Sequence, residues 1–276
     1  MNFSLLLSLY HNENYFFLNQ CFESIWVDQT RQPNEIVLVI DGPIGNELKN
    51  IVDKWIKKIG FTLKVVELSE NRGLGRALNE GLQYCSNEWV FRMDTDDICT
   101  SDRFEKQINF IHDNPEVILF GSQILEFNKE PYDLNVVKSV PLEHSEIKEF
   151  ANSRCPFNHM TVAYKKSIIE SVGGYQHHPF MEDYNLWLRV LGAGYKVANL
   201  SDVLLYARVG NGMHARRKGL EYIKSEKQLL ALKKQLKLQS PVDANILFLM
   251  RSVFRLLPSG ILGKVYNNFL RKKTSN

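Results

Sequence analysis

The sequence predicts an α/β protein built around a doubly wound sheet. Over residues 1–125, apolar runs typical of strands alternate with segments whose apolar residues recur at helical spacing. Within the run EIVLVID, residues 36–40 are all apolar and mostly β-branched, as expected for a strand covered by helices on both faces. Repeated strand–helix–strand units of this kind indicate a parallel, doubly wound sheet.

The expected elements follow one another in a regular order as far as residue 125. Strands are expected at Ser4–Leu9, in EIVLVID, at Leu63–Leu68, in EWVFRM and in VILFG, and helices at Asn14–Asp28, Asn46–Lys58, in GLGRALNEGLQYC and in the segment ending at Asn114. Beyond residue 125 the pattern becomes less regular. It predicts a short helix near Glu146–Asn152 and a longer one in MEDYNLWLRVLGAGY, closed by glycines.

Composition places the chain among ordinary soluble proteins. Its 276 residues are 44% apolar and 24% charged, which suits one large domain or one domain with an appendage. A net charge of +3 gives no argument for nucleic-acid binding. The cysteines, which include no C-x-x-C pair, predict neither a zinc ribbon nor a thioredoxin-like site; they are Cys21, Cys85, Cys99 and Cys155.

The two ends of the chain bear on its location. The N-terminus lacks the basic region and cleavage site of a signal peptide, and no apolar run approaches the ~18 residues of a membrane span. We therefore expect a cytoplasmic protein with reduced thiols. Residues 244–276 combine bulky apolar side chains with six Lys or Arg and no Asp or Glu. This pattern favours an amphipathic segment on an anionic membrane; the alternative is a helix packed on the rest of the protein.

Polar side chains follow three of the expected strands. Asp41 follows IVLVI, Asp94 and Asp96 follow WVFRM, and Asn12 and Glu13 lie just beyond the first strand. Ligands of open parallel sheets bind at the carboxyl ends of strands, so these side chains should converge.

The aspartates of RMDTDD predict a metal site. If the strand continues through Asp94 and Asp96, their carboxylates share one face and suit Mg²⁺ or Mn²⁺. A cation would offset their repulsion, to which Asp97 adds, and would bridge to a diphosphate. The alternative is a turn whose aspartates cap the next helix.

Further signals lie in NRGLGRALNEGL and in the second half of the chain. Arg72 and Arg76 flank a strand-to-helix junction, where helix N-termini attract phosphate. A dinucleotide fingerprint is incomplete, because Leu78 stands where its third glycine belongs, which disfavours a nicotinamide dehydrogenase. Glu182 and Asp183 begin a helix after a glycine-rich turn, a place where the helix dipole alone also favours acids.

Two histidines lie in polar surroundings. His214 stands beside Arg216 and Arg217, and His159 follows a proline-containing turn in CPFNHM. A lone histidine is more often a surface or core residue than a ligand. Arginines beside His214 strengthen its interpretation as a group near a metal diphosphate.

Taken in order, SLLLSLYHNE, EIVLVIDGP, NRGLGRALNEGL, RMDTDD, CPFNHM and GGY…MEDYNLWLR, followed by a histidine, resemble glycosyltransferase family 2. These are inverting enzymes with a GT-A fold, and the resemblance covers about residues 3–215. VIDGP, RMDTDD and CPFNHM look most like bacterial transferases of O-antigen and exopolysaccharide assembly, including the amylovoran-type group. The resemblance implies a mixed GT-A sheet in a catalytic domain over residues 1–215 and a helical basic extension over 216–276.

The resemblance also implies roles for individual residues. Asp183 would be the catalytic base, supported by Glu182, and His159 would lie near the acceptor. Asp94 would contact the ribose or donor sugar and join Asp96 and His214 at the metal. The remaining residues that would bind the nucleotide sugar are Tyr10, Glu13, Asp41, which would contact the base, Arg76 and Arg216.

Two departures from the family pattern concern the base pocket. Ser8-Leu9-Tyr10-His11 stands where many members have Pro-Val-Tyr-Asn, and Ile40 replaces the first of two aspartates before a glycine. Both weaken the expectation of uridine recognition. They leave the implied metal and base residues unchanged.

The sequence thus predicts an inverting transferase that depends on Mn²⁺ or Mg²⁺. It would move a hexose, with glucose expected, from a UDP-sugar to a lipid-diphosphate-linked saccharide at the anionic inner face of the plasma membrane. One alternative is a sugar nucleotidyltransferase, which would need a glycine-rich basic loop after the first strand, where YHNENYFF has none. Another is a non-catalytic saccharide-binding protein on the same frame.

Overall fold

The computed structural model describes residues 1–209 and 219–256, with side chains through Val253. The strands are β1 (Phe3–Leu9), β2 (Glu35–Ile40), β3 (Leu63–Glu67), β4 (Trp89–Arg92), β5 (Ile98–Cys99), β6 (Leu119–Phe127), β7 (Val136–Lys138), β8 (Ala163–Lys165) and β9 (Val197–Arg208). The α-helices are α1 (Tyr15–Phe22), α2 (Asn46–Ile59), α3 (Leu74–Tyr84), α4 (Arg103–Asp113), α5 (His144–Phe150), α6 (Lys166–Ser171), α7 (Glu182–Gly192), α9 (Gly219–Gln235) and α10 (Pro241–Leu256).

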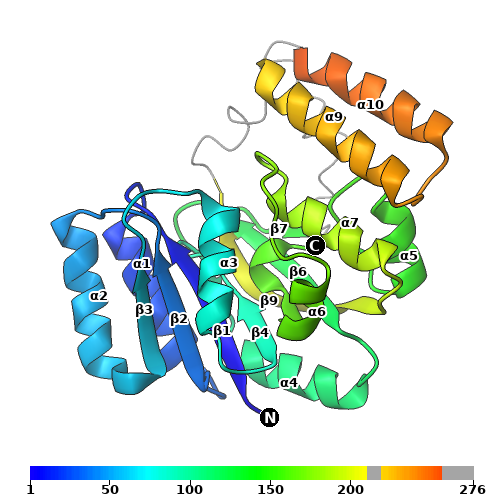
Figure 1. Cartoon of the computed structure of the whole chain (residues 1–276). Helices are drawn as coiled ribbons and strands as arrows, with labels where there is room; N and C mark the ends of the chain where they lie inside the picture. The colour runs from blue at the N-terminus through cyan, green and yellow to red at the C-terminus, as the bar shows by residue number, and fades with distance from the viewer. Residues whose placement is uncertain (210–218, 257–276) are drawn as a thin grey trace.

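In the described part of the chain, nine strands form one mixed sheet (Figure 1). Its order is β3-β2-β1-β4-β8-β6-β9-β5, with β7 paired to β6. Strands β1 to β4 are mutually parallel wherever they pair, which confirms the parallel half predicted from the β–α repeats. Strand β8 runs antiparallel between β4 and β6, and β9 is parallel to β6 but antiparallel to β5. The mixed sheet implied by the family resemblance is therefore also confirmed.

Helices cover both faces of this sheet because its central strands are apolar on both sides. On one face, α1, α2 and α4 bury residues such as Leu18, Trp55 and Phe104 against β1, β2 and β4. On the other, α3, α6 and α7 bury residues such as Leu82 and Trp187. The continuous burial of β2 explains why its residues 36–40 are apolar without alternation.

The first long helix and the fourth strand differ from expectation. The helix predicted over Asn14–Asp28 is α-helical only to Phe22 and continues as a π-helix over Glu23–Val27. Strand β4 ends at Arg92, so the following aspartates lie in a turn. The second difference occurs at the polar edge of the sheet, where tertiary contacts determine the backbone.

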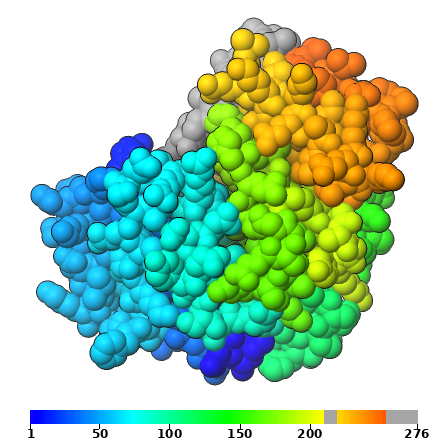
Figure 2. All heavy atoms as spheres, viewed as in Figure 1, coloured from blue at the N-terminus to red at the C-terminus, as the bar shows by residue number. Residues whose placement is uncertain are grey.

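Helices α9 and α10 form an arm that stands on the α7 side of the sheet (Figures 1 and 2). Lys233 of α9 donates to the carbonyl oxygen of Asn152 at 2.7 Å, and its ammonium lies 5.1 Å from the ring centre of Tyr184. Helix α10 is joined to α9 by an ion pair of 3.0 Å between Arg251 and buried Glu226.

Helices α9 and α10 belong to the predicted C-terminal extension. Its described part packs on the rest of the protein through α9, and the choice between the two interpretations of residues 244–276 stays open. Helix α10 nevertheless exposes one row of apolar side chains: Val242, Ile246, Leu249, Met250 and Val253. None of the described helices is both long and apolar enough to cross a membrane. Residues 257–276 of the basic tail lie outside the described residues.

The arm should make folding stability depend on pH through Lys233. Burial lowers its pKa from 10.5 to about 7, with Arg251 adding to the decrease and Glu226 opposing it. Between about pH 7 and 10.5 the unfolded chain therefore binds a proton that the folded chain does not, so this group's contribution to stability rises with pH across that window.

We expect Lys233→Met to be relatively more stabilising at pH 6 than at pH 9, measured by urea unfolding at both values. Exposed Lys234 provides the matched control, because Lys234→Met should leave the wild-type pH slope unchanged. An unchanged slope in Lys233→Met would contradict the assignment.

Candidate active site

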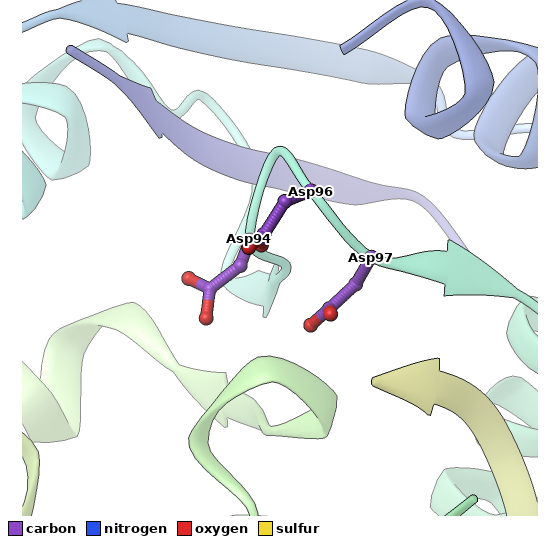
Figure 3. Close-up of side chains that lie close together, drawn as sticks. All are labelled: Asp94, Asp96 and Asp97. Carbon is purple, nitrogen blue, oxygen red and sulfur yellow. The ribbon is translucent and has the colours of Figure 1, made fainter. Parts of the chain in front are cut away.

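Three carboxylates converge where β4 ends and β5 begins (Figure 3). Asp94, Asp96 and Asp97 each offer a carboxylate oxygen, and these atoms lie within 4.8 Å of one another. The condition under which Asp94 and Asp96 would share one face is not met, because β4 ends at Arg92. A turn at Thr95–Asp96 folds the chain back, and this turn brings in Asp97 as well.

Contacts from distant strands hold this turn in shape. The Thr95 hydroxyl lies 3.0 Å from a carboxylate oxygen of Glu13 and 3.4 Å from the carbonyl oxygen of Ser8, both near the end of β1. At the end of β9, the backbone N–H of Arg208 donates to Asp97 at 2.9 Å, and its Nε donates to the carbonyl oxygen of Asp96 at 3.1 Å. The turn is thus fixed by β1 on one side and by β9 on the other.

The protein leaves much of the negative charge here unbalanced. Burial, then the charges of Asp94 and Glu13, raises the pKa of Asp96 to about 7. Burial and the neighbouring Asp96 raise the pKa of Asp97 well above its ordinary value. One oxygen of Asp97 is buried and accepts no hydrogen bond from the described residues. Closely spaced hard oxygen atoms with unmet charge are a donor set that fits Mg²⁺ or Mn²⁺.

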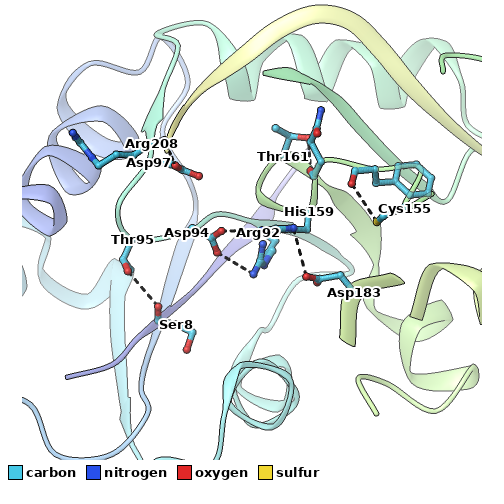
Figure 4. A network of polar contacts seen from close by, with 12 residues as sticks. Ser8, Arg92, Asp94, Thr95, Asp97, Cys155, His159, Thr161, Asp183 and Arg208 are labelled. Carbon is cyan, nitrogen blue, oxygen red and sulfur yellow. Dashed lines mark hydrogen bonds and ion pairs between the residues drawn. The ribbon is translucent and has the colours of Figure 1, made fainter. Parts of the chain in front are cut away.

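Asp94 belongs to a second network as well (Figure 4). One of its oxygens lies 2.9 Å from Nη2 of Arg92, whose side chain is fully buried. The other lies 3.1 Å from Nε2 of His159, and Nδ1 of the same ring lies 3.6 Å from a carboxylate oxygen of Asp183. Burial acts to raise the pKa of Asp94, but Arg92 and then His159 outweigh it and lower the pKa well below its usual range. Residues Asp94–Asp97 are called the aspartate turn below. His159 therefore connects the aspartate turn to α7.

Glu182 and Asp183 form the first turn of α7, as predicted. Burial raises the pKa of Glu182, whose side chain packs against Gly75 of α3; a Cβ at that glycine would lie 3.1 Å from the Glu182 Cγ. One oxygen of Asp183 is buried and makes no hydrogen bond with the described residues. Asp183 thus presents an oxygen that a bound hydroxyl group could use.

The glycine-rich turn before α7 is fixed by α3. The side chain of Asn79 donates to the carbonyl oxygen of Tyr175 at 2.6 Å and accepts from its N–H at 2.7 Å. Gly174 has φ +60°, and a Cβ there would lie 2.6 Å from the Asn79 oxygen, so the position requires glycine. Helix α3 thereby sets the direction in which the chain enters α7.

Asp41 lies at the end of β2, where it holds the neighbouring loop. Its two carboxylate oxygens accept from the backbone N–H groups of Arg72 and Gly73 at 2.7 and 2.9 Å. Gly42 has φ +85°, and a Cβ there would lie 2.5 Å from the backbone nitrogen of Asn71. The chain segments after β2 and β3 are therefore joined closely. The predicted contact between Asp41 and a nucleotide base stays a prediction.

The other sequence-predicted residues are more scattered. Tyr10, exposed to 37%, follows β1 near the half-buried Glu13. Arg76 is exposed on α3 and lines an open groove with Arg72 and Asn79. His214 and Arg216 lie outside the described residues, so their predicted roles at the metal and the nucleotide stay predictions.

Sequence reasoning missed three residues that the structure brings into the site. Arg92, Arg208 and Asp97 contact or belong to the aspartate turn, yet none was among the expected site residues. A signal existed for Arg92, because an arginine within an otherwise apolar central strand must find a buried partner. No comparable local signal distinguishes Arg208, whose partners in this turn lie 111 and 112 residues away.

The sequence of this chain is similar to those of known glycosyltransferases. The family model described as "Glycosyl transferase family 2" matches residues 8–172. An uncharacterized glycosyltransferase of Haemophilus influenzae is 51% identical over 99% of this chain and 100% of its own length. The amylovoran biosynthesis glycosyltransferase AmsE of Erwinia amylovora is 45% identical, covering 96% and 97%. A UDP-Gal:alpha-D-GlcNAc-diphosphoundecaprenol beta-1,3-galactosyltransferase of Escherichia coli is 35% identical, covering 98% and 97%.

Solved structures agree on the fold. S. aureus TarS 1–349 in complex with UDP-GlcNAc superposes with a TM-score of 0.68 at 19% identity, covering 91% of this chain and 72% of that one. The mannosyltransferase PcManGT of Pyrobaculum calidifontis, in complex with GDP-Man and Mn²⁺, gives 0.65 at 19% identity, covering 98% and 81%. With the mixed sheet, the carboxylate turn and these relatives in agreement, the chain belongs to glycosyltransferase family 2 and is a glycosyltransferase with the GT-A fold.

Proposed function

We propose that this glycosyltransferase moves a hexose, with inversion, from a UDP-sugar to a lipid-diphosphate-linked saccharide during assembly of a bacterial surface polysaccharide. The contact of His159 with both Asp94 and Asp183 is the observation that carries the proposal. Through this contact, carboxylates that suit a metal ion lie close to Asp183, the acid at the start of α7. The names of the AmsE and galactosyltransferase relatives support the polysaccharide and the lipid-linked acceptor.

The donor half of the reaction would use the aspartate turn. Asp96 and Asp97, together with Asp94, would hold Mn²⁺ or Mg²⁺, and His214 is proposed as a further ligand. When bound, the cation would supply positive charge for the diphosphate leaving group. Arg92 keeps Asp94 ionised, and Arg208 keeps the turn in shape, so the carboxylates are already in place before the donor arrives.

The acceptor half would use Asp183. The acceptor oxygen attacks the anomeric carbon while its proton passes to the carboxylate of Asp183, with Glu182 in support. The bond between the anomeric carbon and the diphosphate oxygen breaks, and the nucleoside diphosphate leaves with the electron pair. His159 would hold Asp183 at the correct distance from the donor-side aspartates and lie beside the acceptor. The Asp183 oxygen that makes no hydrogen bond with the described residues suits this role.

A membrane surface would bring the acceptor to this site. The exposed row on α10 has the spacing of one helix face, and the sequence after it is basic without an acid. Burial of these apolar side chains in lipid would favour a peripheral position on the inner face of the plasma membrane. Attraction of the basic residues to anionic lipid would add about 1 kcal/mol for each Lys or Arg near the surface. We propose that α10 makes this contact.

The reaction itself is tested with a synthetic lipid-diphosphate sugar acceptor and a panel of sugar nucleotides, followed by mass spectrometry. We expect an acceptor heavier by one hexose with a UDP-hexose; UDP-glucose was expected from the sequence, whereas the E. coli relative's name favours UDP-galactose. Formation of a sugar nucleotide from a sugar phosphate would instead identify a nucleotidyltransferase. Binding of saccharide without any product would identify a binding protein.

The metal is tested first with the wild-type protein. EDTA should abolish transfer, and Mn²⁺ or Mg²⁺ should restore it. Asp96→Asn should remove transfer and the rise in melting temperature that Mn²⁺ produces, but should increase stability without metal because the carboxylates then repel less. The exposed Asp113→Asn is a matched control that should behave like wild type. Full transfer in EDTA would rule out the metal role.

The base is tested with Asp183→Asn, which keeps the size of the side chain and removes its basicity. Because general-base catalysis contributes about 10²–10⁴-fold, kcat should fall by at least about 100-fold while UDP-sugar binding is retained. Glu182→Gln, changed in the same way at the adjacent position, should have a smaller effect. Near wild-type turnover in Asp183→Asn would move the role of base to another group.

The membrane contact is tested with Leu249→Ser/Met250→Ser, because deleting α10 would leave Glu226 without Arg251. The double variant should sediment less with phosphatidylglycerol vesicles and use a lipid-linked acceptor less well, but should retain activity on a short soluble acceptor. Phe61→Ser, which removes a fully exposed ring after α2, is the control. Wild-type vesicle binding by the double variant would contradict the proposal.

A further inference from the structure

The segment that leads into α7 adopts a strained backbone. Phe180 has φ +67°, a conformation that is unfavourable for a bulky side chain and persists only when surrounding contacts enforce it. The backbone N–H of Met181 bonds to the carbonyl oxygen of His178 at 2.9 Å, which closes a tight turn. Glu182 and Asp183 follow directly, so the shape of this turn sets where their carboxylates lie.

Helix α9 supplies the contacts that enforce the turn. Nε2 of His178 lies 2.8 Å from the carbonyl oxygen of Ser225, and the Ser225 hydroxyl donates to the carbonyl oxygen of Pro179 at 2.7 Å. The ring of Phe180 stacks on Tyr222 with centres 5.5 Å apart. Every one of these partners belongs to α9, so the turn is shaped from outside its own part of the sequence.

His178 also contacts the helix that the turn leads into. Its Nδ1 lies 3.0 Å from the amide nitrogen of Asn185, which is on α7 one turn after the acids. Since the Ser225 carbonyl can only accept, Nε2 carries the hydrogen, and Nδ1 accepts from Asn185. A neutral, fully buried imidazole satisfies both neighbours, and burial lowers the pKa of His178 in agreement with this state.

The network continues beyond Asn185 to the glycine-rich turn. The oxygen of Asn185 accepts from Nε of Arg189 at 2.8 Å, and the two terminal nitrogens of Arg189 donate to the carbonyl oxygens of Val172 and Gly174. A continuous set of hydrogen bonds therefore joins α9, the His178–Met181 turn, α7 and the glycine-rich turn.

We propose that α9 positions the catalytic base, with His178 and Tyr222 as positioning residues that hold the strained turn so that Asp183 faces His159. This inference rests on the proposed role of Asp183. It assigns the C-terminal arm a part in transfer that is separate from any contact with a membrane. Neither His178 nor Tyr222 touches the reacting atoms; both act through the backbone of His178–Met181.

The test measures steady-state transfer to a soluble acceptor for each variant, per folded molecule. His178→Leu removes both hydrogen bonds at similar bulk, and Tyr222→Leu removes the ring stack. Each should lower kcat by roughly 10–100-fold, because small misplacement of a reacting group has effects of this size, while KM for the UDP-sugar stays within about twofold. His178→Gln keeps a donor for Ser225 and should recover much of the loss.

Leu229→Ala is the matched control, because Leu229 is a buried α9 residue that packs in the core without bonding to the turn. It should lower the melting temperature but leave kcat per folded molecule near wild type. If His178→Leu does not fold, Tyr222→Leu and the Gln variant carry the test.

The outcomes separate this inference from the proposed function. Wild-type turnover in Asp183→Asn would overturn the base itself. An inactive Asp183→Asn together with folded, fully active His178→Leu or Tyr222→Leu would overturn the positioning role alone. An equal loss of kcat in Leu229→Ala, with no recovery in His178→Gln, would reduce α9 to a purely structural support and would also overturn it.

Discussion

The polar edge of the sheet depends on one buried guanidinium. Arg92 is the last residue of β4 and has no exposed surface, and its charge interacts with both Asp94 and Asp183. Its own carbonyl oxygen accepts a 2.7 Å hydrogen bond from the equally buried Arg103. Removing one partner from a buried ion pair typically costs about 3–5 kcal/mol, because the other charge is left uncompensated. Arg92 is thus the main reason that the pKa of Asp94 stays low although burial acts to raise it.

Two arginines divide the carboxylates into groups with different properties. Arg92 and His159 stabilise the charge of Asp94, whereas the side chain of Arg208 stacks on Phe17 and Phe127, and it contacts Asp96 through a carbonyl oxygen. One acid is thus fixed in its charged form, whereas the pKa values of Asp96 and Asp97 are raised because the protein does not balance their negative charge. This asymmetry is what a site needs if it is to hold its shape alone and still attract a cation.

The sequence revealed the framework better than the connections within it. The strands and helices before residue 125 were predictable because each has one strong periodicity, and the aspartates were recognisable because strand ends gather ligands. The turn at Asp94–Asp97 and the antiparallel strand β8 were not predictable in this way. Hydrophobic spacing tells which face of an element is buried, but it does not tell which distant group meets that face. The roles of Arg208 and His178 depend on such partners, 111 and 47 residues away.

The hydrogen bond between Arg208 and Asp97 bears on when the aspartate turn is completed during synthesis and folding. A ribosome releases the aspartate turn more than a hundred residues before the strand that fixes it, and β9 must insert beside both β6 and β5. Until then the turn has only the contacts made by earlier residues, namely Glu13, Ser8 and Arg92, because long-range pairing comes late in folding. A chain that ends before β9 therefore lacks the Arg208 contacts to Asp96 and Asp97, and the turn is held from both sides only after β9 has joined the sheet.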